Sequence, residues 1–252
     1  MSCLPRMNGG ITINRVMNIK KTKMKKIYNT LFVLVAAGLF FSACKKDDYF
    51  VGGTLHNAKV NMTTYDFLKS NNRGLFDTLL LLVDKAGIKD KINQQGMTFF
   101  APTDYSIRSY CDFRSALEQK KDPFRKWTVD SIIKYELPRF ADSINVYMLP
   151  KRVSYNDLTE NGKMFDTQKT PSKAVVSYES TDDPKLGYNS NSTVLPRVMY
   201  FNFLYKPLDE PFVASEIPND VGARTLVQTS GVESTTGLVH VLVNSHRLFF
   251  AK

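Results

Sequence analysis

The chain of 252 residues can hold one large domain or two small ones, and its 43% hydrophobic and 23% charged residues are typical of a globular protein. The formal net charge is +10, but seven of the 34 basic residues and no acidic residue lie within residues 1–43. The remaining 27 Lys and Arg against 24 Asp and Glu leave a net charge of only +3. With acids interspersed among these bases, the composition argues against a nucleic-acid-binding surface.

The first 43 residues have the layout of a secretory signal peptide. A positive stretch, KKTKMKK at residues 20–26, precedes an apolar run, LFVLVAAGLFF at residues 31–41. This run is shorter than the about 20 residues that a transmembrane helix needs. The sequence FSAC at residues 41–44 resembles a bacterial lipobox, which implies cleavage before Cys44 and lipidation of its sulfur. An uncleaved membrane anchor is the alternative.

Residues 44–59 are polar and contain glycine, and we expect them to form a lipidated tether. The charged run KKDD at residues 45–48 looks like the export signals that send lipoproteins to the surface of some Gram-negative bacteria. The sequence therefore predicts an outer-membrane lipoprotein exposed at the cell surface, with a periplasm-facing orientation as the alternative. After removal of Cys3 and lipidation of Cys44, Cys111 is the remaining thiol, so no intrachain disulfide is expected.

The first half of the folded part has helical spacing. A short helix is predicted around residues 65–68, and apolar residues recur helically over 75–86, where Gly87 suits a left-handed C-cap. Residues 98–101 read as a buried strand, after which the Pro-Thr-Asp sequence at 102–104 offers side-chain oxygens to start a helix.

A further helix is predicted after Thr128, its expected N-cap, and Pro138 is expected to end it. The second half favours strands, at residues 174–178, 198–205, 226–229 and 238–243, with a turn at 234–237. The polar stretch 155–195 is expected to contain long loops. Helices early and strands late predict an α+β fold rather than a parallel α/β fold.

Two segments resemble the signatures of fasciclin domains: TFFAPTD at residues 98–104 and GLVHVL at residues 237–242. Segments 150–158 and 226–229 match the family in the expected order. The resemblance covers residues 60–252 and implies a single fasciclin-like domain with insertions, a β-sandwich or wedge packed with several α-helices. It also implies a binding or adhesion module rather than an enzyme.

The sequence departs from the family at a Tyr-His pair that is linked to adhesion in animal proteins. The matching positions are Val146-Tyr147 or, in another register, Tyr135-Glu136, and neither contains histidine. There is also no Arg-Gly-Asp tripeptide, so integrin-type recognition is not carried over. The extra length falls in residues 106–126 and 159–220, which are candidates for the specific binding surface.

The few reactive side chains favour structural roles. His240 lies inside an apolar strand, where the resemblance implies a hydrogen-bonded structural imidazole near the first signature. A lone histidine lacks the several ligands of a metal site, and we place His246 at the surface or in a loop and His56 in the tether. Cys111 is interpreted as a buried free thiol, because no histidine partner for a nucleophile is evident.

No phosphate-binding loop, nucleophile elbow, zinc-protease motif or glycine-rich dinucleotide loop is present. The sequence thus predicts no enzyme activity, cofactor or metal, but a lipid-anchored binding module for adhesion or contact with a protein or glycan partner. One alternative is an accessory glycan-binding lipoprotein of a polysaccharide uptake system, with exposed aromatic side chains such as Trp127 as a sugar platform. Another is a periplasm-facing structural or assembly protein.

The lipid-anchor hypothesis predicts the behaviour of a Cys44→Ser variant. Without the sulfur that carries the lipid, the protein should leave the membrane fraction while its folded domain stays intact. Fractionation of cells followed by immunoblotting checks this. A variant that stays with the membrane would favour an uncleaved anchor instead.

Overall fold

The computed structural model describes residues 58–188 and 194–251, which belong to a compact unit spanning Gly52–Lys252. The signal peptide, Cys44 and His56 lie outside the described residues. Within the described ranges, no helix is both long and apolar enough to cross a bilayer. Two residues assigned to the tether from sequence, Ala58 and Lys59, form a short strand with the domain.

The helices precede most of the strands, as the sequence predicts. They are α2 (Thr64–Lys69), α3 (Asp77–Ala86), α4 (Lys89–Ile92), α5 (Asp104–Glu118), α6 (Val129–Ser131) and α7 (Leu137–Ser143). Short helical turns follow at η2 (Ile144–Tyr147), η3 (Tyr155–Asp157), η4 (Pro184–Leu186), η5 (Ala214–Glu216) and η6 (Leu248–Phe250). The predicted cap of α3 is confirmed, because Gly87 has φ 66° and ψ 30°, which glycine adopts without steric cost.

The Pro-Thr-Asp sequence starts a helix as predicted, since α5 begins at Asp104, but the Asp104 side chain caps a different helix, α3. Its carboxylate accepts hydrogen bonds from the backbone N–H groups of Thr78 and Leu79, at 2.8 and 3.0 Å, in the first turn of α3. The cap residue of its own helix, Thr103, makes no side-chain capping bond and instead donates to Asn244 at 3.0 Å. The side chains of the Pro-Thr-Asp sequence therefore join the start of α5 to α3 and to the C-terminal segment, and neither caps α5.

The prediction that Pro138 ends its helix is wrong. Thr128 is the N-cap of α6 in a reciprocal capping box with Ser131, as expected of its position. After α6 the helix becomes a π-helix, η1 (Ile132–Glu136), which continues directly into α7. Pro138 lies in the first turn of α7, where a missing N–H costs no helical hydrogen bond.

The strands form a mixed sheet in the order β3-β2-β8-β7-β6-β5-β4, with β1 added to β7. Their bounds are β1 (Ala58–Lys59), β2 (Met97–Ala101), β3 (Met148–Leu149), β4 (Lys163–Asp166), β5 (Lys173–Ser180), β6 (Arg197–Leu204), β7 (Gly222–Glu233) and β8 (Gly237–Leu242). Two pairs, β2 with β8 and β1 with β7, are parallel, and the others are antiparallel. The α+β prediction is confirmed. The polar stretch 155–195 contains the predicted strand at 174–178, which is the middle of β5, and also β4, which was not predicted.

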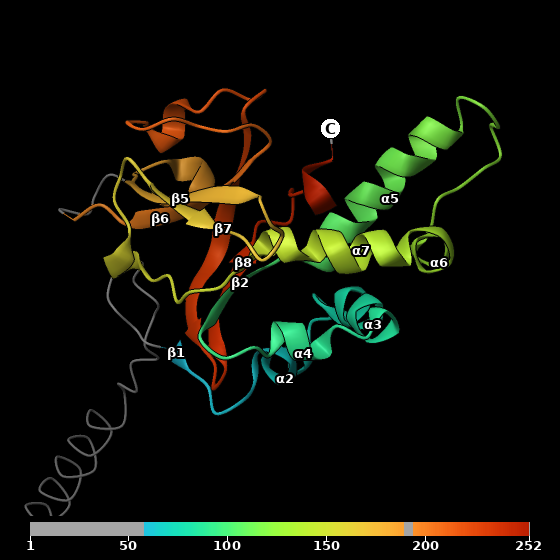
Figure 1. Cartoon of the computed structure of the whole chain (residues 1–252), viewed down its shortest axis with the longest axis horizontal. Coiled ribbons are helices and arrows are strands. Elements are labelled where there is room, and N and C mark those ends of the chain that lie inside the picture. The colour runs from blue at the N-terminus through green and yellow to red at the C-terminus, as the bar shows by residue number, and fades with distance from the viewer. Residues whose placement is uncertain (1–57, 189–193, 252) are drawn as a thin grey trace, which may run out of the picture. The chain divides into compact units, whose positions relative to one another are not determined.

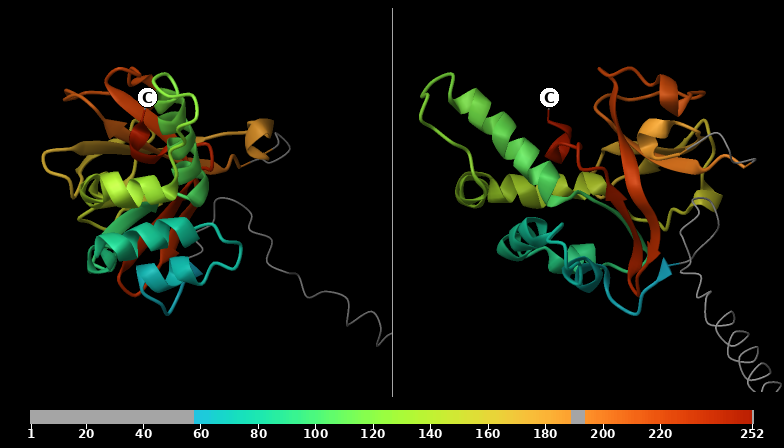
Figure 2. Two further views of the ribbon diagram at one scale, coloured as in Figure 1. Left: turned by 90° about the vertical axis from the view of Figure 1, so that its right-hand side faces the viewer. Right: turned by 180° about the vertical axis from the view of Figure 1, so that it is seen from behind.

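Strand β7 connects the two parts of the sheet. Its first five residues pair with β6, whereas residues 227–233 pair with β8 through two register shifts. Such bulges bend a strand and increase its twist. The prediction of a short strand at 226–229 thus captured only the middle of a much longer one, which Figure 1 shows passing from β6 to β8. Helices α3, α5 and α7 lie together on one side of this junction in both Figure 1 and Figure 2.

The two sequence signatures are neighbouring parallel strands at the centre of the core. Phe100 lies opposite His240 in the register, and their rings stack with centroids 4.8 Å apart. Every residue of β2 and β8 is buried. A Cβ atom on Gly237 would lie 2.1 Å from the carbonyl oxygen of Met97, so only glycine allows the strands to approach at this point.

This packing predicts the cost of truncating the central strands. Phe100→Ala and Leu238→Ala should each lower the free energy of unfolding by about 3 kcal/mol, through lost burial and the cavity left behind. Chemical denaturation checks this, with Phe124→Ala as the matched control because Phe124 is 94% exposed. A cost below about 1 kcal/mol at either strand position would contradict the buried assignment.

Candidate functional site

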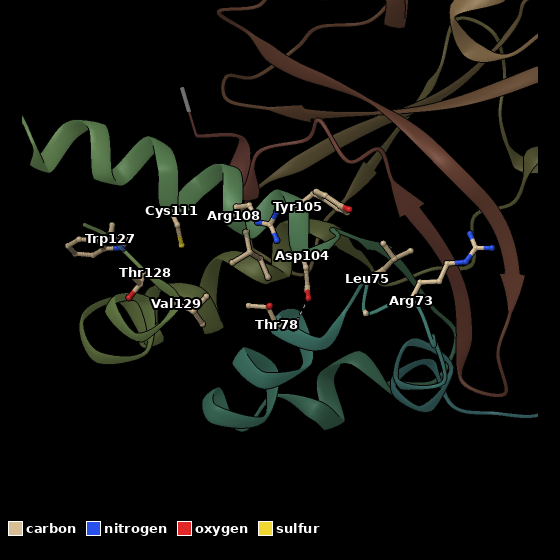
Figure 3. A pocket seen from close by; sticks show the side chains of 12 residues that line it. Arg73, Leu75, Thr78, Asp104, Tyr105, Arg108, Cys111, Trp127, Thr128 and Val129 are labelled. Carbon is tan, nitrogen blue, oxygen red and sulfur yellow. Dashed lines mark hydrogen bonds between the residues drawn. The ribbon is translucent and has the colours of Figure 1, made fainter. Parts of the chain in front are cut away.

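A groove of about 550 Å³ lies between α3, α5 and the segment that enters α6. Residues from all three contribute to its walls, as Figure 3 shows. They are Arg73, Gly74, Leu75, Thr78, Asp104, Tyr105, Ile107, Arg108, Cys111, Trp127, Thr128 and Val129. The walls therefore carry polar and charged groups about as often as apolar ones, so the lining is more polar than that of most small-molecule sites.

Helical periodicity places the α5 side chains in this groove. Asp104, Arg108 and Cys111 are spaced by four and three residues, so they share one face of the helix. Figure 3 shows Arg108 and Cys111 projecting from α5 into the space between this helix, α3 and Trp127. Arg73 also lines the groove, but its guanidinium points away from α5.

Trp127 forms one wall of the groove, and two residues of α5 hold it in place. The Ser115 hydroxyl accepts a hydrogen bond from the backbone N–H of Trp127 at 2.8 Å and donates to its carbonyl at 3.2 Å. The guanidinium of Arg114 packs over the indole ring, 4.5 Å from its centroid. The side chain is only 7% exposed, so the expected sugar platform at Trp127 is not available.

The groove contains a thiol, but its surroundings hold the thiol in the protonated form. Burial, with smaller contributions from Asp112 and Glu136, raises the pKa of Cys111 to about 11. No histidine lines the groove, and Asp104 is already bonded to the start of α3. A nucleophilic cysteine needs a lowered pKa and an adjacent base. The groove is therefore suited to binding rather than to thiol chemistry.

One exposed donor in the groove, the guanidinium of Arg108, has no acidic or acceptor partner among the described residues. The indole Nε1 of Trp127 is buried without a hydrogen bond. The guanidinium of Arg108 makes no ion pair in residues 58–188 and 194–251, and it lies over the Tyr105 ring, 5.5 Å from the ring centroid. The Arg108 guanidinium suits a ligand that presents acceptor oxygens or negative charge.

A buried polar cluster behind the groove fixes α5 against the π-helical turn. The hydroxyl of Tyr110 donates to Glu136 at 2.9 Å and accepts from Arg139 at 2.9 Å. Arg139 also bonds Glu136 at 3.1 Å, and Arg114 approaches the same carboxylate at 3.6 Å. Burial and the Glu136 carboxylate raise the pKa of Tyr110. This cluster could not be predicted from the sequence, because its members come from three helical segments, α5, η1 and α7.

The structural role predicted for His240 is confirmed. Its Nε2–H donates to the carbonyl of Val153 at 2.9 Å, and its Nδ1 accepts from the N–H of Gly231 at 3.1 Å. Both ring nitrogens are thus satisfied in the neutral form. Burial lowers the pKa of His240 to about 4, although the bond to Val153 opposes this shift.

Of the two positions predicted for His246, at the surface or in a loop, only the loop position is confirmed. This residue lies in a loop, but its imidazole is buried and pairs with the hydroxyl of Tyr147 at 2.7 Å. The same hydroxyl accepts from the N–H of Phe249 at 2.7 Å. Burial lowers the pKa of His246 to about 3. Tyr147 is one of the two candidate tyrosines in the Tyr-His comparison, and it is fully buried rather than exposed for recognition.

Other candidate sites are sparse in the described part of the chain. In residues 58–188 and 194–251, no three His, Cys, Asp or Glu residues come together in a way that could hold a metal ion. The exposed aromatic side chains are Tyr105, Phe124, Tyr135 and Tyr205, which belong to four different segments. The groove and the loop beyond α5 that carries Phe124 are therefore the surfaces of interest.

Comparison with known proteins does not assign the chain to a family. No family model matches it, and neither does any curated protein. Among solved structures, a FAS1 domain pair from the insect cell adhesion molecule fasciclin I is similar with a TM-score of 0.41 and 10% sequence identity. The match covers 71% of this chain and 46% of that chain, so the chain spans about half the length of the insect structure. At this level the likeness carries no argument about function.

The two buried histidines predict a loss of stability in mild acid. Their pKa values are lowered on folding, so the unfolded state binds more protons below about pH 6.5, and stability falls as pH falls until the folded-state pKa is reached. The expected loss is about 1–2 kcal/mol per histidine between pH 7 and 5.

Urea unfolding at both pH values measures this loss. A His246→Gln variant provides the comparison, because it should show a smaller pH dependence by one histidine's contribution even if it is less stable throughout. Equal stability of the wild-type protein at the two pH values would contradict neutral burial of the imidazoles.

Proposed function

We propose that the chain is a lipid-anchored binding module of the bacterial cell envelope, built on a fasciclin-like α+β wedge and serving adhesion or contact with a partner. The signatures at residues 98–104 and 237–242 support the fasciclin-like architecture, since they are distant in sequence but pair in register as β2 and β8. The signal-peptide layout before Cys44 supports export and lipidation. The charges at residues 45–48 support display at the cell surface.

The groove between α3, α5 and Trp127 is the observation that carries the binding function. It presents the exposed guanidinium of Arg108 beside both apolar and polar side chains. Its cysteine has a raised pKa and no histidine beside it in the lining. A site with donors but without a nucleophile and base recognises a ligand rather than transforms it, so we propose that the protein is not an enzyme.

A protein partner fits this groove better than a flat run of sugar rings. Glycan platforms use exposed aromatic rings, whereas Trp127 is buried as a wall and the exposed rings are dispersed. Strand addition is also disfavoured, because the end strands β3 and β4 have only two and four residues. We therefore propose a partner that inserts an acidic or carbonyl-bearing side chain between α5 and Trp127.

A binding screen of fragment 52–252 tests this proposal. The fragment corresponds to the compact unit and contains the described hydrophobic core. It should select proteins over polysaccharides on paired arrays of matrix proteins and glycans. Arg108→Ala should weaken binding about tenfold, the usual cost of one lost hydrogen bond to a charged group. Trp127→Phe should also weaken binding, because it alters the shape of one wall of the groove.

Lys85→Ala supplies the control, because Lys85 is an exposed cation on α3 that does not line the groove. Thermal unfolding of each variant separates lost binding from lost stability. Binding that is indifferent to both groove variants would rule out the groove as the site. Selective binding of polysaccharides would favour the accessory glycan-binding alternative.

A further inference from the structure

The loop between α5 and Trp127 combines the most exposed aromatic side chain of the described residues with a cluster of positive charge. Phe124 is 94% exposed, whereas most other phenylalanines of the domain pack in or against its core. It is flanked by Lys120, Lys121, Arg125 and Lys126, all of them exposed. Figure 1 shows this loop at the end of α5 that lies farther from the sheet, and Figure 2 shows the same from behind.

A hydrogen-bonded turn holds Phe124 outward. The carboxylate of Asp122 accepts from the N–H of Phe124 at 3.0 Å, and the carbonyl of Asp122 accepts from the N–H of Arg125 at 3.0 Å. Pro123 occupies the second position of this turn, where its fixed φ suits the geometry. The exposure of Phe124 therefore results from a defined turn.

The ends of the loop are also fixed. At the α5 end, the carbonyl of Glu118 accepts from the N–H groups of Lys121 and Asp122, at 2.9 and 3.0 Å. At the other end, Ser115 bonds the backbone of Trp127. A loop anchored at both ends presents its tip at a low cost in conformational entropy on binding.

The positive charge of the loop is only partly neutralised. Arg125 approaches Glu118 at 3.5 Å, whereas Lys120, Lys121 and Lys126 have no ion pair among the described residues. The one acid of the tip, Asp122, is occupied in the turn. The loop thus carries three lysines without an ion pair among the described residues and an exposed phenyl ring.

We propose that this loop, residues 119–126, docks the domain on an anionic lipid surface. Phe124 would enter the headgroup boundary, while the lysine and arginine side chains contact lipid phosphates. Apolar area and cationic charge are the two contributions that bind peripheral segments to bilayers. A protein partner for such a loop would be expected to offer a cavity for the ring, whereas a lipid surface needs only the projecting ring and the charge. The proposal does not depend on lipidation of Cys44 or on the groove.

Co-sedimentation of fragment 52–252 with lipid vesicles tests the proposal. The fragment lacks the apolar run at residues 31–41, which would bind vesicles by itself. It should bind vesicles of mixed phosphatidylglycerol and phosphatidylcholine, bind pure phosphatidylcholine much less, and lose binding as salt is raised. The double variant Lys120→Gln/Lys121→Gln should weaken binding about 25-fold, and Phe124→Ala about tenfold.

The matched control for charge is Lys85→Gln/Lys91→Gln, which removes two exposed lysines from α3 and α4 and should leave binding unchanged. The matched control for apolar area is Leu81→Ala, on the exposed side of α3. Because all these side chains are exposed, thermal unfolding should be little changed in every variant.

Fluorescence of a Phe124→Trp variant reports insertion directly. Its emission should shift to the blue on addition of anionic vesicles, beyond any change in the parent protein, whose sole tryptophan is Trp127. Three results would each overturn the proposal: no binding to anionic vesicles, equal loss in the loop and control variants, or capture of a protein by the loop without lipid binding. None of these results would alter the groove's response to Arg108→Ala.

Discussion

The parallel pairing of β2 with β8 is the contact on which the rest of the domain depends. It joins segments about 140 residues apart, and the carbonyl of Met97 leaves no room for a side chain at Gly237. His240 extends this pairing, because its two ring nitrogens bond Val153 and Gly231 on either side. Loss of the close approach would therefore disturb the chain after β3 and the bulged part of β7 as well as the strands themselves.

Asp104 links the β2–β8 pair to the helices of the domain. This residue follows β2 directly, and its carboxylate caps α3 while its own helix, α5, leaves in another direction. A single carboxylate thus fixes the relation between a buried strand and the two helices that form the groove. The position of the groove is in this sense a consequence of the core, although its lining comes from segments with little periodic signal.

Sequence patterns predicted the parts of the fold that local chemistry determines. Continuous apolar runs indicated β2 and β8, and the apolar periodicity before Gly87 indicated α3 with its cap. These patterns failed at positions whose structure depends on contacts with residues far away in the sequence. The polar residues of β7 gave no strand pattern over its full length, because it is a strand through its pairing with β6 and β8. The helix also continues past Pro138, because a π-helical segment precedes this proline.

The candidate site shows the same division. Burial of Cys111 could be predicted, because a lone thiol without a base usually packs in a core. Burial of His246 could not, since it depends on Tyr147, 99 residues earlier in the chain. The groove was also missed. In the sequence Trp127 reads as the start of a helix, and its place as a wall of the groove depends on its hydrogen bonds to Ser115 of α5.

The two proposed surfaces share one stretch of backbone. The loop that carries Phe124 ends at Trp127, which is a wall of the groove, and Ser115 and Arg114 on α5 hold that end in place. A contact that displaced the loop tip would act on the groove through this short connection. Thermodynamic linkage would make the effect reciprocal, so that a ligand in the groove would alter lipid binding by the same factor as lipid alters ligand binding. The size of that factor depends on how firmly the hydrogen bonds to Ser115 keep Trp127 in place when the loop around Phe124 binds lipid.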